Sequence, residues 1–287
     1  MRSLLLLVAI VSFSSAAFGQ FSVRDFGAKG DGLTLDTKSI QRAIDKAHAE
    51  GGGVVNFTPG TYKVGSLFLK DNVELHLGAG SALLGSADIK DYTAASQKYE
   101  SRTKDLYARF FMIFAEGARN ISITGQGIID GNGLKHFQNT RPQNLRPFMI
   151  RLVDCRNVVI RDVQLLEAAN WTLHLLGCED VKVQGVVIRN NGEGNRDGLD
   201  IDACVSVNVS DCVISATDDA IVLKASNDFI CRDVTITNCI LGSNGSAIKT
   251  GTESNGGFRN IVVSNCVVKD IPVHAAIELM TVDGGMM

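Results

Sequence analysis

Short runs in which apolar and polar residues alternate recur along most of the chain. Self-comparison aligns runs of this kind that begin at Asn120, Asn157, Asp180, Ser206, Asp233 and Asn260. The first interval between their starts is 37 residues, and the later intervals are 23 to 27 residues. Alternation with period two is typical of a strand with one buried face. A repeat of this length indicates a solenoid of stacked coils.

Each repeat has room for short strands joined by turns but not for a helix. A coil of three short strands needs roughly 20 residues or a little more, and successive coils stack about 4.8 Å apart as parallel strands. Parallel crossovers are nearly always right-handed. The pattern therefore predicts an all-β fold, a right-handed single-stranded parallel β-helix (solenoid), in which the polar stretch over residues 131–147 is an inserted loop.

One helical segment precedes the repeats. Its apolar stripe consists of Ile40, Ala43, Ile44 and Ala47. Asp36 or Thr37 can cap its start, and the glycines at 51–53 end it. A solenoid needs a cover over its first coil, so we expect this short helix to be the N-terminal cap. Strands are expected next over residues 54–57, 66–69 and 73–77.

The two ends of the chain carry separate expectations. Residues 1–19 resemble a signal peptide, because Arg2 precedes an apolar run over residues 4–11 and small residues stand at 17 and 19. The alternative is a buried N-terminal strand. The run is too short to span a membrane, and no later segment is apolar enough to do so. We therefore expect a secreted or periplasmic β-helix domain over residues 20–287, truncated at its C-terminus because no cap follows the last coil.

Composition narrows the possible partners. Hydrophobic residues make up 45% and charged residues 21% of the chain, as in ordinary globular proteins. The net charge of −3 does not suggest a nucleic-acid partner, and an acidic substrate would need local cationic side chains. We expect a monomer.

The seven cysteines form no Cys-x-x-Cys pair, so no zinc site is expected. Cys212, Cys239 and Cys266 lie 27 residues apart, which predicts a column of small buried residues.

Polar residues occupy matching positions in the segments that follow the alternating runs. In a parallel stack, matching positions fall on one line. The first predicted column contains Trp171, Asp197, Asp219 and Ser246, and the second contains His174, Asp200, Val222, Lys249 and Glu278. Asp197 would then lie against Asp219 on the next coil, with Asp218 beside it.

Three carboxyl groups in one patch suggest acid–base chemistry. Like charges this close resist joint ionisation, so at least one carboxyl should hold its proton more tightly than normal. A protonated acid beside ionised carboxylates is what glycoside hydrolysis requires: the acid protonates the leaving oxygen, and a carboxylate activates water. The alternative is that Asp218 and Asp219 only cap a turn, where aspartate is favoured for its local hydrogen bonds.

Two sets of motifs resemble a known family. The segments Phe26-Gly-Ala-Lys-Gly-Asp-Gly, Asp36-Thr-Lys-Ser-Ile, Gly51-Gly-Gly-Val-Val and Pro59-Gly-Thr-Tyr resemble the N-terminal part of pectin-lyase-like β-helix proteins, a fold shared by hydrolases, lyases and phage tail spikes. Asn195-Arg-Asp197-Gly and Thr217-Asp218-Asp219 resemble the Asn-x-Asp and Asp-Asp motifs of glycoside hydrolase family 28, the polygalacturonase family. The resemblance implies an inverting mechanism without a metal or other cofactor. It also implies that Asp218 is the general acid and that Asp197 and Asp219 position and activate water.

The chain departs from the family pattern at two places. Gly245-Ser246-Ala247 stands where the family usually has Gly-His-Gly, and Glu278 and Met280 stand where it has the Arg-x-Lys pair that binds the uronate carboxylate. Lys249, or Lys224 as a second candidate, could supply the missing positive charge. The resemblance therefore implies a pectin-type acidic polysaccharide or oligosaccharide, galacturonan or rhamnogalacturonan, as the substrate class.

Further substrate-binding residues are expected around the acids. Asn195 is expected to orient Asp197, and Ser246 takes the place of the family histidine. Trp171 is either a platform on which a sugar stacks or a core residue. His174 is either a buried partner or a substrate contact.

Two other functions fit the same sequence. Clustered aspartates could bind calcium in a polysaccharide lyase, with Lys249 or Lys224 as the base. A non-catalytic carbohydrate-binding β-helix, such as an adhesin, would not require three converging acids. Activity that survives a chelator would exclude the lyase, and loss of function on Asp218→Asn would exclude the adhesin.

Overall fold

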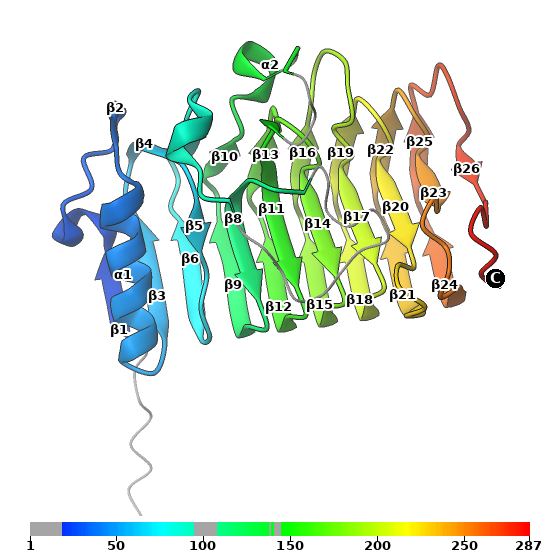
Figure 1. The fold of residues 1–287 in the computed structure, drawn as a ribbon, viewed down its shortest axis with the longest axis horizontal. Coiled ribbons are helices and arrows are strands. Elements are labelled where there is room, and N and C mark those ends of the chain that lie inside the picture. Colours follow the sequence, from blue (N-terminus) through cyan, green and yellow to red (C-terminus); the bar gives the residue numbers. More distant parts are fainter. Residues whose placement is uncertain (1–18, 95–107, 138, 141–144) are drawn as a thin grey trace, which may run out of the picture.

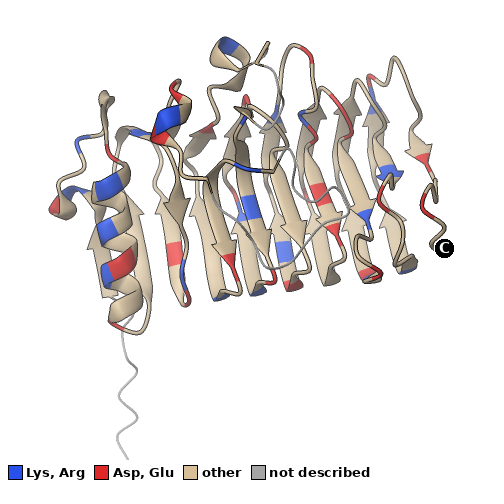
Figure 2. Ribbon diagram, viewed as in Figure 1, with Lys and Arg blue, Asp and Glu red and all other residues tan. Residues whose placement is uncertain are grey.

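The computed structural model describes residues 19–94, 108–137, 139–140 and 145–287, and these residues form a right-handed parallel β-helix (Figure 1). In this part of the chain, three parallel sheets, here called A, B and C, run along the solenoid. Charged residues interrupt strands that are otherwise largely uncharged (Figure 2). The predicted fold class is confirmed.

Sheet A contains the alternating runs on which the fold prediction rested. Its strands are β1 (Gly19–Ser22), β3 (Gly53–Phe57), β6 (Val73–Leu77), β9 (Arg119–Gly125), β12 (Arg156–Arg161), β15 (Glu179–Gln184), β18 (Val205–Ser210), β21 (Cys231–Thr237) and β24 (Phe258–Ser264). Val158 pairs with Ile121 on one side and with Val181 on the other. All three side chains are 1% exposed, so the alternation predicted from the sequence places apolar residues in the core.

A left-handed residue lies at the start of each aligned run. Asn120, Asn157, Asp180, Ser206, Asp233 and Asn260 have φ values between 54° and 59°. Asparagine and aspartate tolerate this conformation better than most residues. The Nδ2 atom of Asn157 also donates to Oδ1 of Asn120 at 2.8 Å, and Nδ2 of Asn120 donates to Oδ1 of Asn72 at 2.8 Å. The turn at the start of each sheet A strand is therefore stabilised by side-chain hydrogen bonds between coils as well as by its own backbone conformation.

Sheets B and C complete each coil. Sheet B contains β2 (Asp31–Leu35), β4 (Gly60–Val64), β7 (Ser81–Gly85), β10 (Ile128–Asp130), β13 (Gln164–Leu166), β16 (Val187–Arg189), β19 (Val213–Ala216), β22 (Ile240–Ser243) and β25 (Val267–Lys269). Sheet C contains β5 (Leu67–Phe68), β8 (Phe111–Glu116), β11 (Phe148–Val153), β14 (Leu173–Leu176), β17 (Leu199–Asp202), β20 (Ile221–Lys224), β23 (Ile248–Thr250) and β26 (Ile277–Glu278). In sheet C, Leu173, Leu199 and Ile221 pair in line and belong to the core, so alternate residues of the same strands face away from it.

The predicted cap is α1 (Thr37–Ala49), which packs against the first coils (Figure 1). Its apolar stripe, Ile40, Ala43, Ile44 and Ala47, is fully buried. Asp36 precedes the helix, but its side chain does not bond the helix amides. Its carboxylate instead accepts hydrogen bonds from Lys29 N at 2.7 Å and Gly30 N at 2.9 Å. The expected capping role of Asp36 is corrected: this side chain holds the preceding loop.

The first coils differ from the prediction in sheets B and C. β3 and β6 confirm two of the expected strands, whereas the expected strand over 66–69 is the shorter β5, and β4 was not expected. Phe68 N donates to Gln41 Oε1 at 2.8 Å, and Gln41 Nε2 donates to Phe68 O at 3.0 Å. The side chain of a helical residue thus covers the outer edge of β5, where sheet C begins.

The predicted insertion lies between β10 and β11. It contains a short helix, α2 (Gly133–His136), which the sequence analysis did not anticipate. Two short 3₁₀ helices, η1 (Val23–Phe26) and η2 (Ile89–Asp91), are further additions. Residue 138 and residues 141–144 lie outside the described part of the chain.

The cysteines form columns inside the solenoid. Cys212 and Cys239 are 1% exposed and Cys266 is half-buried, which confirms the predicted column. Cys155, Cys178, Cys204 and Cys231 form a second column that was not predicted. All seven thiols are free in the described structure.

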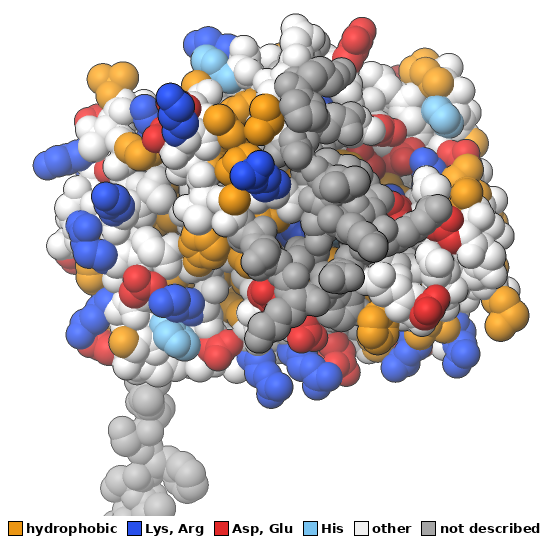
Figure 3. Space-filling model, in the orientation of Figure 1, with side chains coloured by type: hydrophobic (Ala, Val, Ile, Leu, Met, Phe, Trp, Pro, Cys, Tyr) orange, Lys and Arg blue, Asp and Glu red, His pale blue; other side chains and the backbone are white. Residues whose placement is uncertain are grey.

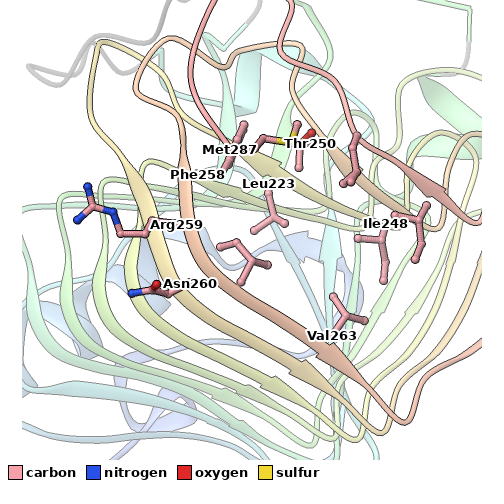
Figure 4. A pocket seen from close by; sticks show the side chains of 11 residues that line it. Leu223, Ile248, Thr250, Phe258, Arg259, Asn260, Val263 and Met287 are labelled. Atoms are coloured by element: carbon pink, nitrogen blue, oxygen red, sulfur yellow. The ribbon is translucent and has the colours of Figure 1, made fainter.

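The ends of the described chain differ in character. Gly19, placed in the predicted signal peptide, begins β1 and pairs with Gly53, and the rest of that peptide lies outside the described residues. Among the residues that are described, no helix is long and apolar enough to cross a membrane. At the last coils, apolar side chains line a cavity of about 500 Å³ (Figure 4). That further coils follow stays a prediction.

Candidate active site

The acidic residues lie just before the strands of sheet C. Leu199 pairs with Ile221, and Gly198 N donates to Asp219 O at 2.9 Å, so Asp197 lies against Asp219 on the next coil. The same ladder continues to Trp171 on one side and Ser246 on the other, which confirms the first predicted column. His174, Asp200, Val222, Lys249 and Glu278 pair in succession and confirm the second column.

Burial and mutual repulsion change the ionisation of these acids. Asp197 and Asp219 are each 4% exposed, and Asp218 is half-buried. Burial, followed by the charges of Asp218 and Asp219, raises the pKa of Asp197 well above its usual value. Burial and the neighbouring Asp219 also raise the pKa of Asp218. The patch can therefore hold a proton at pH values where an exposed aspartate cannot.

Asp219 is held by two partners. Lys249 Nζ lies 2.8 Å from its Oδ2, and Ser246 N donates to its Oδ1 at 2.8 Å. Burial lowers the pKa of Lys249, but the contact with Asp219 outweighs it and the net shift is upward. Lys249 therefore stays cationic and orients this carboxylate.

Asp218 faces an open groove. Asn195 Nδ2 donates to its Oδ2 at 3.2 Å, so the amide expected to orient Asp197 bonds Asp218. The groove has a volume of about 340 Å³ and is lined by Glu193, Gly194, Asn195, Thr217, Asp218, Asn244, Gly245, Val273 and His274. A Cβ atom on Gly245 would lie 2.7 Å from Asp219 Oδ1, so glycine alone leaves this space clear. Figure 3 shows acidic and basic side chains gathered on this face, toward the C-terminal coils.

Lys224 lies behind the acids. It is 5% exposed, with Nζ 2.9 Å from Glu253 Oε2, 3.9 Å from Asp200 Oδ1 and 4.7 Å from the centroid of the Trp171 ring. Burial lowers the pKa of Lys224, but Glu253 and Asp200 reverse that effect and raise it. Lys224 is thus a buried cation that stabilises the surrounding carboxylates.

The aromatic residues of the site pack against one another. Trp171 is 8% exposed, and its ring centroid lies 5.3 Å from that of Phe148 and 5.0 Å from that of His174. His174 is 1% exposed; Arg151 Nη1 donates to its Nδ1 at 2.8 Å, and its Nε2 lies 3.6 Å from Asp202 Oδ2. Burial, then Arg151, lowers the pKa of His174 to about 4, so the ring is neutral at most working pH values.

Four of the predicted substrate-binding residues are buried. Trp171, His174, Lys224 and Ser246 are at most 8% exposed. Ser246 Oγ donates to Glu278 Oε2 at 2.5 Å. This burial fits the alternatives of a core position for Trp171 and a buried partner role for His174. Substrate contact by the four side chains stays a prediction, while Asn195 faces the groove and Lys249 bonds Asp219.

For several residues of the site, no role was predicted from the sequence. Asp200, Asp202 and Glu253 are buried carboxyl groups next to the predicted acids, and His274 lines the groove. One signal could have identified His274: the register aligns Ala275 with Ser246 and Asp219, and the positions before these three residues are His274, Gly245 and Asp218. No comparable pattern marks Glu253, which follows β23 in an irregular segment.

Among the described residues, no group of three or more His, Cys, Asp or Glu side chains is placed to hold a metal ion. The acids are bonded instead to lysine, serine and asparagine side chains or amides.

A parallel β-helix with this N-terminal cap defines the class of pectin-lyase-like proteins. The sequence model of Glycosyl hydrolases family 28 matches residues 72–278, and the chain belongs to that family.

Three relatives illustrate the similarity. A "Probable polygalacturonase" of Vitis vinifera is 30% identical over 218 residues, which is 72% of this chain and 44% of the relative. The structure of a family 28 exopolygalacturonase of Yersinia enterocolitica is 27% identical, with a TM-score of 0.82 over 95% of this chain and 58% of that one. A stretch of 79 residues, 25% of this chain, is 49% identical to "Alginate lyase 7" of Azotobacter vinelandii and covers 9% of it. The chain thus spans less than half of the curated relatives that it matches.

Proposed function

We propose that this protein is an inverting glycoside hydrolase that cleaves a pectin-type acidic polysaccharide, galacturonan or rhamnogalacturonan. The observation that carries the proposal is the convergence of Asp197, Asp218 and Asp219 beside one groove. The comparisons support the proposal in two ways: the chain belongs to family 28, and two of the similar proteins are named as polygalacturonases. Export as a monomer to the periplasm or the medium belongs to the same proposal, since a polymeric substrate lies outside the cell.

The proposed mechanism gives each acid one task. Asp218 faces the groove with a raised pKa, so it holds a proton and donates it to the glycosidic oxygen as the bond to the anomeric carbon breaks. Water adds to that carbon from the opposite side and gives its proton to Asp219, which Lys249 and Ser246 N hold in place. Asp197 positions the water. The proton then returns to Asp218 through solvent, and the site is restored.

Product analysis tests this proposal. Incubation with homogalacturonan, rhamnogalacturonan and short oligomers is expected to release saturated products whose first anomeric form is inverted relative to the bond cleaved. We expect the rate to be unchanged by a chelator. Nuclear magnetic resonance of the early products and ultraviolet absorbance would measure both results. A retained anomeric configuration would contradict the mechanism.

A polysaccharide lyase is the second candidate, because a quarter of the chain resembles a protein named as an alginate lyase. A lyase would create an unsaturated uronate that absorbs in the ultraviolet. Unsaturated products that vanish on addition of a chelator would favour this candidate over hydrolysis. Equal binding of polysaccharide by the parent and by Asp218→Asn, without any products, would favour the non-catalytic reading.

Lys249 is the cation that we propose for the substrate carboxylate. Lys249→Gln is expected to lower kcat/KM on an acidic polymer by about 10- to 100-fold, the usual effect of losing a charge-assisted hydrogen bond. The loss should be smaller on a carboxyl-reduced polymer. Steady-state kinetics on both polymers would measure this, with Lys182→Gln, an exposed lysine of sheet A, as the control. Equal losses on the two polymers would assign Lys249 to Asp219 alone.

A further inference from the structure

Most carboxyl groups behind the groove have a cation or hydrogen-bond partner, but two of them do not. Lys249 lies 2.8 Å from Asp219, and Lys224 lies 2.9 Å from Glu253. Asp202 lies next to His174 and accepts hydrogen bonds from Ser226 N at 2.9 Å and Ser226 Oγ at 2.8 Å. Among the described residues, Asp197 and Asp200 have no comparable partner.

Asp200 is the more isolated of these two acids. It is fully buried, and neither carboxyl oxygen has a hydrogen-bond partner in the described structure. Its nearest cation, Lys224 at 3.9 Å, is closer to Glu253. Its neighbours in the ladder are His174, which is neutral, and the apolar Val222. An ionised carboxylate in these surroundings would lack the hydrogen bonds that normally offset desolvation.

The charged groups around Asp200 point the same way. Burial, then the charge of Asp197, raises the pKa of Asp200 well above its usual value. Asp219 and Glu253 act in the same direction, and only Lys224 opposes them among the main contributors. Asp202 lies on the same strand and is occupied by Ser226 and His174. Because Asp197 is 4% exposed whereas Asp200 is 0% exposed, ionisation costs less at Asp197.

We propose that Asp200 is held as a neutral carboxylic acid and that, by carrying the proton which this buried pair of acids retains, it leaves Asp197 ionised beside the groove. Asp200 is then a positioning residue for Asp197. The protonation of Asp200 follows from the structure alone, and only the benefit to Asp197 rests on the proposed function.

Infrared spectroscopy tests the protonation without any substrate. The test uses Asp218→Asn as the background, because the general acid Asp218 would contribute a neutral carboxyl band of its own. At neutral pH this background should show the carbonyl stretch of a neutral carboxyl group, and adding Asp200→Asn should remove that band. Asp211→Asn is the matched control, because Asp211 is exposed and hydrogen bonds to Ser210 and other side chains lower its pKa; the band should remain. No band in the Asp218→Asn background, or a band that survives the further change Asp200→Asn, would overturn the proposal.

The pH dependence of thermal unfolding gives a second measurement. A carboxyl whose folded-state pKa is raised costs stability as pH rises above the unfolded value of 3.8, until the folded pKa is passed. Asp200→Asn removes this cost. The Tm of Asp200→Asn minus the Tm of the parent should therefore rise by about 2–8 °C when the pH is raised from acidic to alkaline. For Asp211→Asn, this Tm difference from the parent should not rise with pH. Parallel curves for the parent and Asp200→Asn would count against a neutral Asp200.

Kinetics test the positioning role. Asp200→Asn keeps a neutral donor group, so we expect kcat within about threefold of the parent and an unchanged acidic limb of the pH profile. Asp200→Val keeps the branched shape but not the donor, and should lower kcat about tenfold at unchanged KM. An acidic limb that moves by about a pH unit in Asp200→Asn would show that a negative charge had been removed, and would refute the proposal. If no polysaccharide is cleaved, the infrared result still decides the protonation state.

Discussion

Replacing Asp218 by asparagine is expected to lower kcat for polysaccharide hydrolysis by about 10³-fold, within the range of 10² to 10⁴ for loss of a general acid. The amide fills the same space beside Asn195 but cannot donate a proton to the leaving oxygen. Asp219→Asn and Asp197→Asn should be similarly impaired, because each removes a carboxylate that activates or positions water. A reducing-end assay on the preferred polymer would measure the three rates.

Two controls make this result specific. Asp180→Asn changes an exposed aspartate at a sheet A corner and should leave the rate unchanged. Each active-site variant should remain folded, with the circular dichroism spectrum of the parent, because asparagine preserves the volume of the side chain. Near-normal rates in two of the three variants would show that the proposed mechanism is incorrect.

Lys224→Met should have the largest effect on folding. The change leaves Glu253, which is 7% exposed, without its cation and removes the charge over the Trp171 ring. Breaking one side of a buried ion pair costs about 3–5 kcal/mol in the free energy of unfolding. Urea denaturation followed by circular dichroism would measure the loss.

The pH dependence of this loss follows from the two partners. The net pKa of Lys224 is raised, so its contribution is fully present below 10.5 and does not change between about pH 5 and pH 9. The pKa of Glu253 is lowered: burial raises it, but Lys224 outweighs burial. Its contribution is therefore present above 4.5 and is lost as pH falls through the folded pKa. The difference in free energy of unfolding between the parent and Lys224→Met should thus become smaller at acidic pH.

A double variant supplies the control for Lys224. Lys224→Met combined with Glu253→Gln removes both charges, so no unpaired glutamate remains, and part of the stability should return. Additive losses in the double variant would mean that the two side chains do not stabilise each other. The 2.9 Å contact would then carry no net energy.

The repeat made much of the fold and site predictable. Parallel coils with a nearly constant register bring equal positions into line, so the spacing of alternating runs was sufficient to place Asp197 against Asp219 and Lys249 against Val222. The same reasoning explains the cysteine column, since a small side chain at one corner faces the same corner of the next coil. β4 escaped prediction because the first coils lack the aligned repeat.

The sequence by itself therefore determined the solenoid, its cap and the columns that hold the acids, because those follow from local alternation and a repeat length. Only the tertiary structure decided which charges are paired and which residues reach the groove. Glu253 meets Lys224 because the irregular segment after β23 lies against the residue that follows β20, where Ala225 N donates to Glu253 O at 2.9 Å. Trp171 and His174 pack against each other and against Phe148 of the preceding coil. Such contacts depend on how turns and outward side chains fill space, which no alignment of repeats specifies.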